Sequence, residues 1–490
     1  MSSIGVEPRQ VAVRKFPELA PTVAAGHSRD HFQWAVTTVE QVLDFLTVTF
    51  ASAMAYTLYS ALHVGKQVHY SHMAVFEGAG CFAVMFIAML GMNGAYDEGN
   101  SLLRVRETER ILRVSCQAFL TVFAATFFSA RLISRGTLVG SMLLVPVLLI
   151  AEKELLFTCL RHLHARGYGT RKVIVYGAGM TGRRLFSALL RSPKLGLIPV
   201  AIVDDDFNLA GREIFEYSYR RERSAKVQSG PLSESLIRSL DASMVIVAIP
   251  SLREEKLNQI ASIGLSADAI VAFVPKLAAS SDLTPNYLDV DGVLISSLQP
   301  LPRKGAYEFS KRAFDVACSL LLLPIMTPVW ALIALLVRLD SSGPIFFRQA
   351  RVGKNGVLFQ IWKFRSMRAD ASEYDFHPSD TQDPRITRIG RWLRRTSLDE
   401  TPQLLNILRG DMSLVGPRPE MPFIVETYEE RHWQRLQVIP GLTGLWQLSA
   451  DRAFQIHENI HYDLYYIRNR NFFMDIAILL HTALFAMKGV

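Results

Sequence analysis

The chain has 490 residues, a length that suggests about three domains at roughly 150 residues each. Hydrophobic residues make up 50% of it and the mean hydropathy is +0.19, which is high for a purely water-soluble protein, yet 20% charged residues indicate at least one ordinary soluble domain. A net charge of +8 suits nucleic acid, an anionic membrane surface or a phosphorylated substrate, and composition alone does not choose among them.

The start of the chain is basic and lacks an apolar core. Arg9, Arg14, Lys15 and Arg29 lie within it, so we expect no cleavable signal peptide and assign residues 1–37 to a cytoplasmic tail. Cysteine usage excludes two further classes of protein. The four cysteines lie in apolar stretches without a C-x-x-C pair, which predicts buried thiols, no disulfide framework and no zinc site.

Four apolar segments follow the tail, at residues 42–62, 72–92, 114–133 and 138–160. Each is long enough to cross a hydrocarbon core of about 30 Å, which needs roughly 20 helical residues. Acidic residues inside the first, second and fourth segments must face a partner or lie near a helix end. Arginines cluster in the loop at residues 104–113 and after the fourth segment, so the positive-inside rule places both ends in the cytoplasm. We predict a four-helix transmembrane bundle over residues 38–163.

The next stretch, RKVIVYGAGMTGRRLFSALL, contains a β-branched run and then Gly177-x-Gly179-x-x-Gly182. A second apolar run ends in Asp204, about twenty residues further on, which completes the dinucleotide fingerprint of strand, glycine turn, helix, strand and acid. Further strands are expected at residues 244–248 and 269–274, so we predict a Rossmann-like (CoA-binding-like) domain over residues 171–297. Two interpretations stay open: nucleotide binding, with phosphate at the helix N-terminus, or a glycine turn kept for its geometry.

The segment KRAFDVACSLLLLPIMTPVWALIALLVRLD, residues 311–340, is long enough to span a membrane, but two features argue that it turns back. Pro324 and Pro328 each remove a backbone donor, which predicts a sharp bend, and Thr327 can hydrogen-bond a carbonyl freed there. Basic residues flank both ends, and a spanning helix would export one of these clusters. We expect a re-entrant helix; a proline-kinked fifth span is the alternative.

The segment RRTSLDETPQLLNILRGDMSLVGPRPE, residues 394–420, places Asp399 and Glu400 side by side between groups of arginines. Ser397-x-x-Glu400 is also a capping box, which would begin a helix that ends at Gly410. That interpretation leaves Asp399 unexplained, together with the surrounding basic residues Arg385, Arg388, Arg391, Arg394, Arg395, Arg409 and Arg418. Because cations near a helix start oppose its dipole, we infer a bound anion such as a pyrophosphate; solvated arginines are the alternative.

The tetrapeptide Gly416-Pro417-Arg418-Pro419 predicts a rigid turn that aims the Arg418 guanidinium, a group suited to bidentate contact with phosphate. Phosphoryl transfer needs an aligned nucleophile and cations on the transferring oxygens, and an aspartate can act as a covalent nucleophile. Such sites commonly use Mg²⁺ held by one or two carboxylates. The carboxylate pair and its arginines therefore predict a phosphoryl-transfer site at a membrane surface.

The last apolar stretch, residues 472–487, is short and is interrupted by Asp475 and His481. It fits an interfacial or packed helix better than a membrane span.

These motifs together resemble the monotopic phosphoglycosyl transferases, the bacterial sugar transferases that start exopolysaccharide and O-antigen repeats. The resemblance covers residues 305–490 through KRAFDVACSLLLLPIMTP, SSGPIFFRQARVGKNGVLFQIWKFRSM, DPRITRIGRWLRRTSLDETPQLLNILRGDMSLVGPRPE, PGLTGLWQLSA and HYDLYYIRNRNFFMDIAILLHTA. The preceding residues resemble the large subgroup, the polyprenyl-phosphate hexose-1-phosphate transferases. The resemblance implies a membrane α-helical bundle, an α/β Rossmann-like domain and an α-rich monotopic catalytic domain with a re-entrant membrane helix.

By position, the resemblance implies that Asp399 is the nucleophile that attacks the β-phosphate of a UDP-sugar. UMP leaves, and the aspartyl phosphosugar is then attacked by a polyprenyl phosphate. Glu400 is implied as the second member of the pair, acting in positioning, in metal binding or as a base. Mg²⁺ is the implied cofactor, with Asp399 and Glu400 as its ligands. The basic residues expected near the phosphates are Lys363, Arg394, Arg418 and, from the arginine spacing, Arg388.

Other features follow from the same resemblance. Thr327-Pro328 matches the Ser-Pro break of the family's re-entrant helix, and Pro324 adds a second break. The segment WQLSADRAFQ lacks the Gly-Arg-Asn of many members, so the sugar stays open, with glucose expected first and galactose second. The implied partners are UDP-hexose, undecaprenyl phosphate, the bilayer and a second copy of the chain, but no nucleic acid. The implied location is the bacterial inner (cytoplasmic) membrane, with the catalytic domain facing the cytoplasm.

Two other functions are considered. Tyr307-x-x-x-Lys311 has the spacing of short-chain dehydrogenases and, with the Gly177 fingerprint, would suit an NAD-dependent nucleotide-sugar dehydratase or epimerase in the membrane. That function leaves the C-terminal motifs unexplained. Alternatively, the chain is a scaffold of a polysaccharide export complex, in which case residues 305–490 alone would have no transfer activity.

Overall fold

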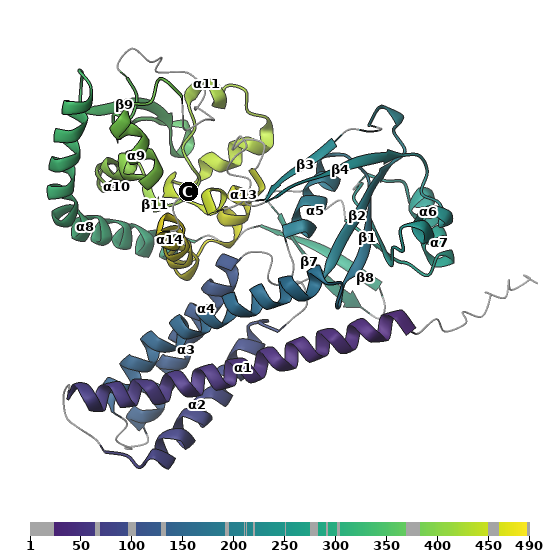
Figure 1. The fold of residues 1–490 in the computed structure, drawn as a ribbon, viewed down its shortest axis with the longest axis horizontal. Coiled ribbons are helices and arrows are strands. Elements are labelled where there is room, and N and C mark those ends of the chain that lie inside the picture. The colour runs from purple at the N-terminus through teal and green to yellow at the C-terminus, as the bar shows by residue number, and fades with distance from the viewer. Residues whose placement is uncertain are drawn as a thin grey trace, which may run out of the picture.

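The computed structural model describes residues 24–487 except residues 64–68, 97–103, 129–133, 192–195, 210, 212, 219–220, 250, 275–282, 291–292, 301–303, 369–382 and 449–459. Its described part has three regions: a helical bundle, a Rossmann-like sheet with helices on both faces, and a helix-rich C-terminal domain (Figure 1). The order of these regions agrees with the sequence prediction. Most of the expected tail at residues 1–37 lies outside the described residues, and the first helix already begins at Ala24.

The bundle consists of α1 (Ala24–Leu62), α2 (His72–Met92), α3 (Arg104–Phe128) and α4 (Arg135–Ala165). Its core is formed by buried apolar residues of all four helices, among them Val48, Phe86, Val114 and Leu149. The arginine-rich residues 104–113, expected to be a loop, are the first turns of α3 instead. Arginine and glutamate are good helix formers, and ion pairs at i,i+3 and i,i+4 spacing, such as Glu107–Arg110 and Glu109–Arg113, support the helix there.

Three of the described helices are long and apolar enough to cross a membrane: residues 34–62 of α1, all of α2, and α8 (Gly305–Asp340). The other two bundle helices do not meet this criterion. The first half of α3 is charged, and α4 carries Glu152, Lys153 and Glu154 in its middle. Length and composition therefore support α1 and α2 as spans, and α3 and α4 share a buried core with them.

A buried cluster of charges joins α1 and α4. The Lys153 ammonium lies 2.6 Å from Asp44 Oδ1 and 3.0 Å from Glu40 Oε1, and all three side chains are buried. The hydroxyl of Tyr96 donates a hydrogen bond to Asp44 Oδ2 at 2.8 Å. These contacts supply the partner that the acidic residue inside the first apolar segment requires.

The cysteines are free thiols, but their predicted burial is wrong for two of them. Cys81 on α2 and Cys159 on α4 are exposed, whereas Cys116 and Cys318 are half-buried. Both exposed thiols lie on apolar helices, whose outward faces also carry apolar residues such as Phe76 and Leu155. An apolar sequence neighbourhood therefore does not place a residue in the core when the helix itself has an apolar surface.

The second region is a six-stranded sheet with the strand order β3-β4-β2-β1-β5-β6, all parallel except the pair β3–β4. The four strands predicted from the sequence are confirmed as β1 (Arg171–Tyr176), β2 (Leu197–Asp204), β5 (Met244–Val247) and β6 (Ile270–Phe273). The remaining strands are β3 (Glu213–Ser218) and β4 (Arg221–Ser229). Helix α5 (Met180–Arg191) packs on one face of the sheet, and α6 (Glu234–Ser239) and α7 (Glu254–Ser266) pack on the other.

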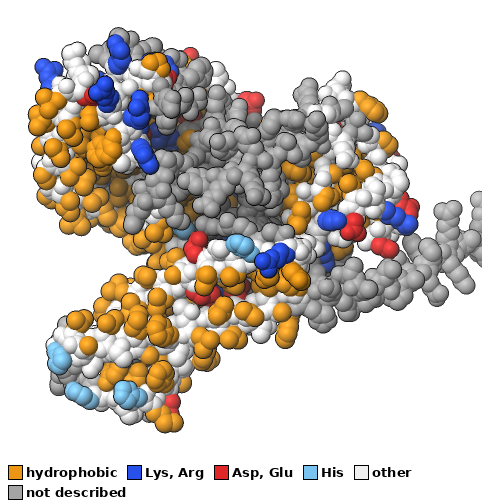
Figure 2. All heavy atoms as spheres, in the orientation of Figure 1, with side chains coloured by type: hydrophobic (Ala, Val, Ile, Leu, Met, Phe, Trp, Pro, Cys, Tyr) orange, Lys and Arg blue, Asp and Glu red, His pale blue; other side chains and the backbone are white. Residues whose placement is uncertain are grey.

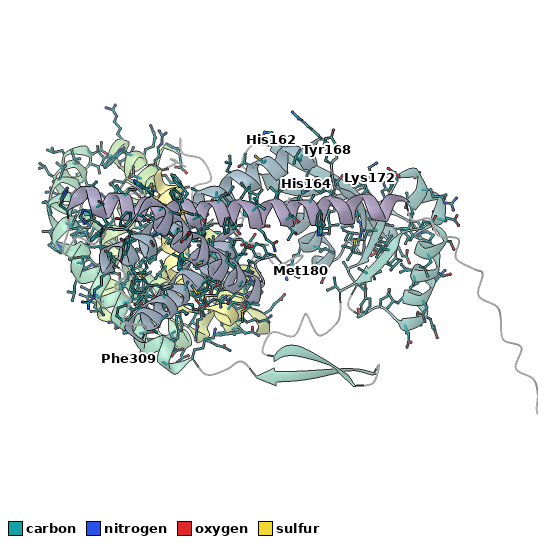
Figure 3. The ribbon with its side chains drawn as sticks, turned by 90° about the horizontal axis from the view of Figure 1, so that it is seen from below. His162, His164, Tyr168, Lys172, Met180 and Phe309 are labelled. Atoms are coloured by element: carbon teal, nitrogen blue, oxygen red, sulfur yellow. The ribbon has the colours of Figure 1, made fainter. Side chains whose placement is uncertain are left out.

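A hairpin of β7 (Leu283–Val290) and β8 (Val293–Pro300) connects this sheet to the third region. The hairpin forms a separate two-stranded sheet and stands apart from the six-stranded one in Figure 3. The polypeptide then enters α8 near Phe309, which is exposed at the edge of the molecule.

The C-terminal domain is built on α8 and on two short sheets. Strands β9 (Phe346–Val352) and β10 (Leu358–Phe364) are antiparallel, whereas β11 (Ser413–Val415) and β12 (Gly441–Thr443) are parallel. The helices are α9 (Arg388–Thr396), α10 (Leu404–Arg409), α11 (Pro422–Val425), α12 (Leu445–Leu448), α13 (Ile460–Asn469) and α14 (Phe472–Met487). Their shared core includes Leu404, Ile407, Met412, Tyr466 and Ile478.

Helix α8 bends in its middle and runs along two sides of the domain (Figure 1). Pro324 and Pro328 lie in this helix, as the sequence predicts for a bend. The Thr327 hydroxyl donates a hydrogen bond to Leu323 O at 2.8 Å, so it does not bond the carbonyl of Leu320 or Pro324, which the prolines leave free. Such bonding of a threonine hydroxyl to the preceding turn itself bends helices.

The outer surface of α8 is apolar. Leu320, Leu321, Ile325, Leu332 and Leu335 are each more than half exposed. Hydrophobic side chains cover the side of the domain along α8 and much of the bundle, whereas Lys and Arg gather at the end of the domain farthest from the bundle (Figure 2). The described surface therefore offers two apolar areas that water solvates poorly.

The last helix, α14, packs between the bundle and the C-terminal domain, which confirms a packed helix. Met474, Ala477 and Ile478 are buried in the same core cluster as Val105 of α3. Thr108 Oγ1 and His481 Nε2 are hydrogen-bonded at 2.9 Å, and the Asn471 amide donates to Glu109 Oε1 at 3.3 Å. The first turns of α3 are therefore part of a bundle helix, but their side chains pack into the core of the C-terminal domain.

The Lys153 cluster generates a stability prediction. We expect Lys153→Met to lower the free energy of unfolding by about 3–5 kcal/mol, because Asp44 and Glu40 would remain buried without a cation. Thermal unfolding of the detergent-purified protein, followed by helical circular dichroism, measures this effect. Lys172→Met, which removes the exposed ion pair with Asp241, is the control and should change the melting temperature little. Equal shifts in the two variants would contradict the prediction.

Candidate functional site

The carboxylate pair lies on a short 3-10 turn, Leu398–Gln403, between α9 and α10. Ser397 has a left-handed backbone conformation (φ 56°, ψ 17°) and ends α9, and its side chain makes no capping hydrogen bond. The predicted capping box is therefore wrong, because the Glu400 side chain is used elsewhere. The predicted stop at Gly410 is confirmed by its positive φ of 95° and its hydrogen bonds to Asn406 O and Ile407 O.

Glu400 is held by two cations from distant parts of the sequence. Lys363 Nζ, on β10, donates to Glu400 Oε1 at 2.7 Å, and the Arg418 guanidinium donates to the same oxygen at 2.9 Å. Burial raises the pKa of the Glu400 carboxyl, but Arg418 and Lys363 outweigh this effect and hold the pKa well below its ordinary value. Glu400 is therefore ionised at neutral pH and acts as the link between β10 and the Arg418 turn.

Asp399 differs from its neighbour in its surroundings. Its side chain is 7% exposed, and within the part of the chain that the structure describes it makes no hydrogen bond or ion pair. Burial raises the pKa of the Asp399 carboxyl, the charge of Lys363 opposes that rise, and the adjacent Glu400 adds to it. Glu400 is thus paired with two cations, whereas Asp399 remains free to act as a nucleophile or a metal ligand.

Arg394 completes the basic surroundings of the pair. Its Nε donates to Ser366 Oγ at 3.0 Å, which fixes the guanidinium on α9 beside the turn. Burial lowers the pKa of Arg394, while the nearby charge of Asp399 raises it. The structure thus brings Lys363, Arg394 and Arg418 around the pair, in agreement with what the family resemblance implies.

Arg388 does not join this group. It is the first residue of α9 and is exposed, and among the described residues no hydrogen bond or ion pair connects it to the carboxylates. Arg391 and Arg395 are also exposed on the same helix, together with Trp392. The helical spacing of these arginines correctly predicted one charged face, but that face points to the surface of the domain.

No motif in the sequence indicates the contact between α8 and the turn. Trp330 Nε1 donates to Thr401 Oγ1 at 2.9 Å, and the Thr401 hydroxyl donates to Leu398 O at 2.8 Å. Trp330 lies two residues after Pro328, so the bent helix is hydrogen-bonded to the turn that carries the pair. Tryptophan in an apolar helix is common, and only the fold reveals what its N–H contacts.

The carboxylates fit the requirements for Mg²⁺ only in part of the coordination shell. No group of three or more His, Cys, Asp or Glu side chains able to hold a metal occurs among the residues that the structure describes. Mg²⁺ in phosphoryl-transfer sites is commonly held by one or two carboxylates and by substrate phosphates. Asp399 and the second oxygen of Glu400 can supply those one or two protein ligands.

The glycine turn of the Rossmann-like domain is formed as predicted. Gly177 has a φ of 111°, and a Cβ at Gly182 would lie 1.6 Å from Gly177 O, so both positions require glycine. Gly179, by contrast, has open space around it. Asp204 Oδ2 accepts a hydrogen bond from Ala178 N at 2.6 Å. This contact fixes the acid of the fingerprint to the glycine turn.

Tyr307 and Lys311 serve a structural role that is remote from the glycine turn. The Tyr307 hydroxyl and the Lys311 ammonium both donate to Asp475 Oδ2 on α14, at 2.7 and 2.9 Å. Tyr466 donates to the other oxygen of Asp475 at 2.8 Å. The pair therefore fixes the start of α8 to α13 and α14, and this arrangement leaves the dehydratase interpretation without its catalytic residues.

Comparison with known proteins identifies two family models. The bacterial sugar transferase model matches residues 306–489, and the CoA-binding domain model matches residues 91–265. The matches cover the domain with the carboxylate pair and much of the region before it, respectively.

Named relatives align over much of the chain. The UDP-glucose:undecaprenyl-phosphate glucose-1-phosphate transferase of Escherichia coli is 31% identical over 334 residues, which are 65% of this chain and 68% of that protein. The undecaprenyl-phosphate galactose phosphotransferase of Salmonella typhimurium is 30% identical, over 70% of this chain and 72% of its own. The undecaprenyl-phosphate glucose phosphotransferase of Komagataeibacter xylinus is 43% identical over 38% of each chain.

The ion pairs of Glu400 generate a prediction on pH. Because folding lowers the pKa of Glu400 below about 4.5, the pairs stabilise the protein above that pH, and the stabilisation is lost as the pH falls through the lower pKa of the folded state. We expect Glu400→Gln to cost about 1–3 kcal/mol at pH 7 and progressively less below pH about 4.5. Melting temperatures from pH 7 to pH 3 measure the difference.

The control for this experiment is Glu308→Gln, which removes a half-exposed partner of Arg470. Its effect should be small across the pH range. A difference between the wild type and Glu400→Gln that does not change with pH would contradict the assignment of the lowered pKa to Glu400.

Proposed function

Because the chain belongs to the bacterial sugar transferase family, we propose that this transferase moves hexose 1-phosphate from a UDP-hexose to undecaprenyl phosphate and releases UMP. Glucose is the first expected sugar, because several of the matching relatives are named for glucose transfer, and galactose is the second, because a relative named for galactose matches to a similar degree. The observation that carries the proposal is the buried Asp399 carboxylate, unpaired among the described residues and surrounded by the cations Lys363, Arg394 and Arg418.

In the first step, an oxygen of Asp399 attacks the β-phosphorus of the UDP-hexose. A bond forms between that oxygen and phosphorus, the bond from phosphorus to the bridging oxygen breaks, and UMP leaves with the electron pair. The nucleophile must be ionised, and Lys363 opposes the effect of burial on the Asp399 pKa. Arg394 and Arg418 lie where their charges can stabilise the phosphate oxygens during transfer.

In the second step, an oxygen of undecaprenyl phosphate attacks the phosphorus of the aspartyl phosphosugar, and the Asp399 carboxylate leaves. The product is undecaprenyl diphosphohexose. Glu400 has a positioning role in this scheme, because one of its oxygens already binds both Lys363 and Arg418. Because Lys363 and Arg418 make the Glu400 carboxylate a weak base, we do not assign Glu400 as a general base in either step.

Asp399 and the second oxygen of Glu400 would hold Mg²⁺. When bound, the ion would neutralise charge on the diphosphate of the donor. The cations supplied by the chain itself are Lys363, Arg394 and Arg418, and they would bind and orient the phosphates beside the ion.

The lipid substrate requires the site to lie at a membrane surface. We propose that α8 is re-entrant, entering and leaving the bilayer on the cytoplasmic side of the inner membrane, where UDP-sugars are available. The bend at the prolines, the apolar outer face of α8 and the basic residues at both of its ends support this topology. The hydrogen bond from Trp330 to Thr401 would then keep the nucleophile at the interface.

The decisive prediction concerns the nucleophile. We expect Asp399→Asn to lower UMP release from UDP-glucose by about 10³-fold or more, because the amide cannot form the covalent intermediate. A radiolabelled donor should leave a phosphosugar on the peptide at residues 398–401 of the wild type and none on the variant. Product formation by the wild type without any such adduct would contradict the covalent scheme.

The same assay identifies the sugar and contains its control. UDP-glucose, UDP-galactose and UDP-N-acetylgalactosamine are compared at equal concentration with undecaprenyl phosphate as the acceptor. Glu308→Gln should retain wild-type turnover, since Glu308 is half exposed at the start of α8 and contacts Arg470 rather than the pair. Turnover with UDP-galactose and none with UDP-glucose would reverse the proposed order of sugars.

The topology is tested with single cysteines. The four native cysteines are first replaced by alanine, because Cys81 and Cys159 are exposed and would react. We then expect cysteines at Ser310 and Ser342, before and after the bend of α8, to be labelled by a membrane-impermeant maleimide only in inverted membrane vesicles. Labelling of the two positions from opposite sides would establish a spanning helix and overturn the re-entrant topology.

A further inference from the structure

A second, buried arginine hydrogen-bonds the backbone of the turn at residues 416–419 that carries Arg418. Arg435, in the 3-10 helix Glu430–Gln437, is 3% exposed. One of its terminal nitrogens donates to the carbonyl oxygen of Arg418 at 2.9 Å, and its Nε donates to Asp463 Oδ2 at 2.7 Å. The other terminal nitrogen contacts the Tyr428 hydroxyl and, at 3.4 Å, Glu420 Oε1. Each of the three nitrogens of this guanidinium therefore has an acceptor.

Burying these charged groups costs desolvation free energy, which is unfavourable for a contact with a purely structural role. Arg435 and Asp463 are both buried, and replacing a buried ion pair with apolar residues of similar volume is often neutral or stabilising. Burial lowers the pKa of Arg435, but Asp463 more than compensates, so the guanidinium keeps its charge. What an apolar pair could not supply is a rigid set of donors that binds a backbone carbonyl and two carboxylates together.

The geometry of the turn explains what this set of donors achieves. Pro417 and Pro419 restrict the backbone on both sides of Arg418. On one side, Gly441 N donates to Pro417 O at 2.9 Å, and a Cβ at Gly441 would lie 2.0 Å from Gly416 N. On the other side, Arg435 fixes the next carbonyl, that of Arg418 itself. With its backbone held on two sides, Arg418 directs its guanidinium at Glu400, beside Asp399.

We propose that the Arg435–Asp463 ion pair is a positioning device for the catalytic turn, acting through the Arg418 carbonyl rather than on the substrate. Asp463, on α13, orients Arg435; Arg435 fixes the Arg418 backbone; and the Arg418 side chain reaches the site. The proposal rests on the proposed function only for its kinetic readout. It extends the site to a helix that contributes no side chain to the carboxylate pair.

The test is a double-mutant cycle on UMP release. Arg435→Lys keeps the charge but cannot contact Asp463 and the Arg418 carbonyl together, and Asp463→Asn keeps the shape but removes the charge that orients Arg435. We expect each variant to lower kcat for UDP-glucose by about 10- to 100-fold with a smaller change in KM. The reason is that Arg418 contributes more to stabilising the transition state of phosphate transfer than to binding the substrate in its ground state.

Coupling to Arg418 separates positioning from general stability. In an Arg418→Lys background, where there is no longer a guanidinium to aim, Arg435→Lys and Asp463→Asn should each cost less than about threefold. Losses by the same factor in both backgrounds, or no loss in the wild-type background, would overturn the proposal. Asp463→Asn provides an independent cycle if Arg435→Lys yields little folded protein.

Two controls keep the outcomes distinct. Arg470→Lys alters another arginine of low exposure, just after α13, whose partner is Glu308, and it should change kcat by less than about twofold. Wild-type protein and Asp399→Asn are assayed in parallel. If the wild type releases no UMP from any UDP-sugar, the proposed function fails; if the wild type is active and the cycle is additive, only the positioning proposal fails.

Discussion

The site depends on one shared oxygen. Glu400 Oε1 accepts hydrogen bonds from Lys363 on β10 and from Arg418 on the proline-bounded turn, while the backbone next to Glu400 carries Asp399. Three segments that are separate in the sequence therefore meet at a single carboxylate. The two carboxylates also differ in protonation behaviour, because Arg418 and Lys363 hold the pKa of Glu400 below its ordinary value, whereas burial raises the pKa of Asp399. The division of labour within the pair follows from this contact.

Much of this arrangement could be predicted from the sequence because its parts are local. The glycine fingerprint lies within one strand-turn-helix unit, so its strands were placed correctly. The rigid turn at Arg418 follows from two prolines, and the stop of α10 follows from Gly410. The convergence of Lys363, Arg394 and Arg418 was predicted through the family resemblance, because residues so far apart leave no spacing signal.

The errors arose where tertiary contacts override local patterns. Ser397-x-x-Glu400 matches a capping box, but the ion pairs of Glu400 outweigh the hydrogen bond that a cap would form. Residues 104–113 are polar enough for a loop, yet local ion pairs support a helix there, and Val105 packs into the same core as α14. The hydrogen bond of Trp330 and the acceptors around Arg435 depend on how distant helices pack, which no short motif encodes.

The joint between α3 and α14 has a practical consequence. Val105 belongs to the core cluster of the C-terminal domain, and Thr108 is hydrogen-bonded to His481. A fragment that begins at α8 would therefore lack α3, and the apolar side chains of α14 that pack against α3 would be exposed to solvent. A truncated enzyme would need lipid, detergent or a substitute helix to cover them. Low solubility or low activity of such a fragment would therefore reflect the loss of α3 as much as any defect in catalysis.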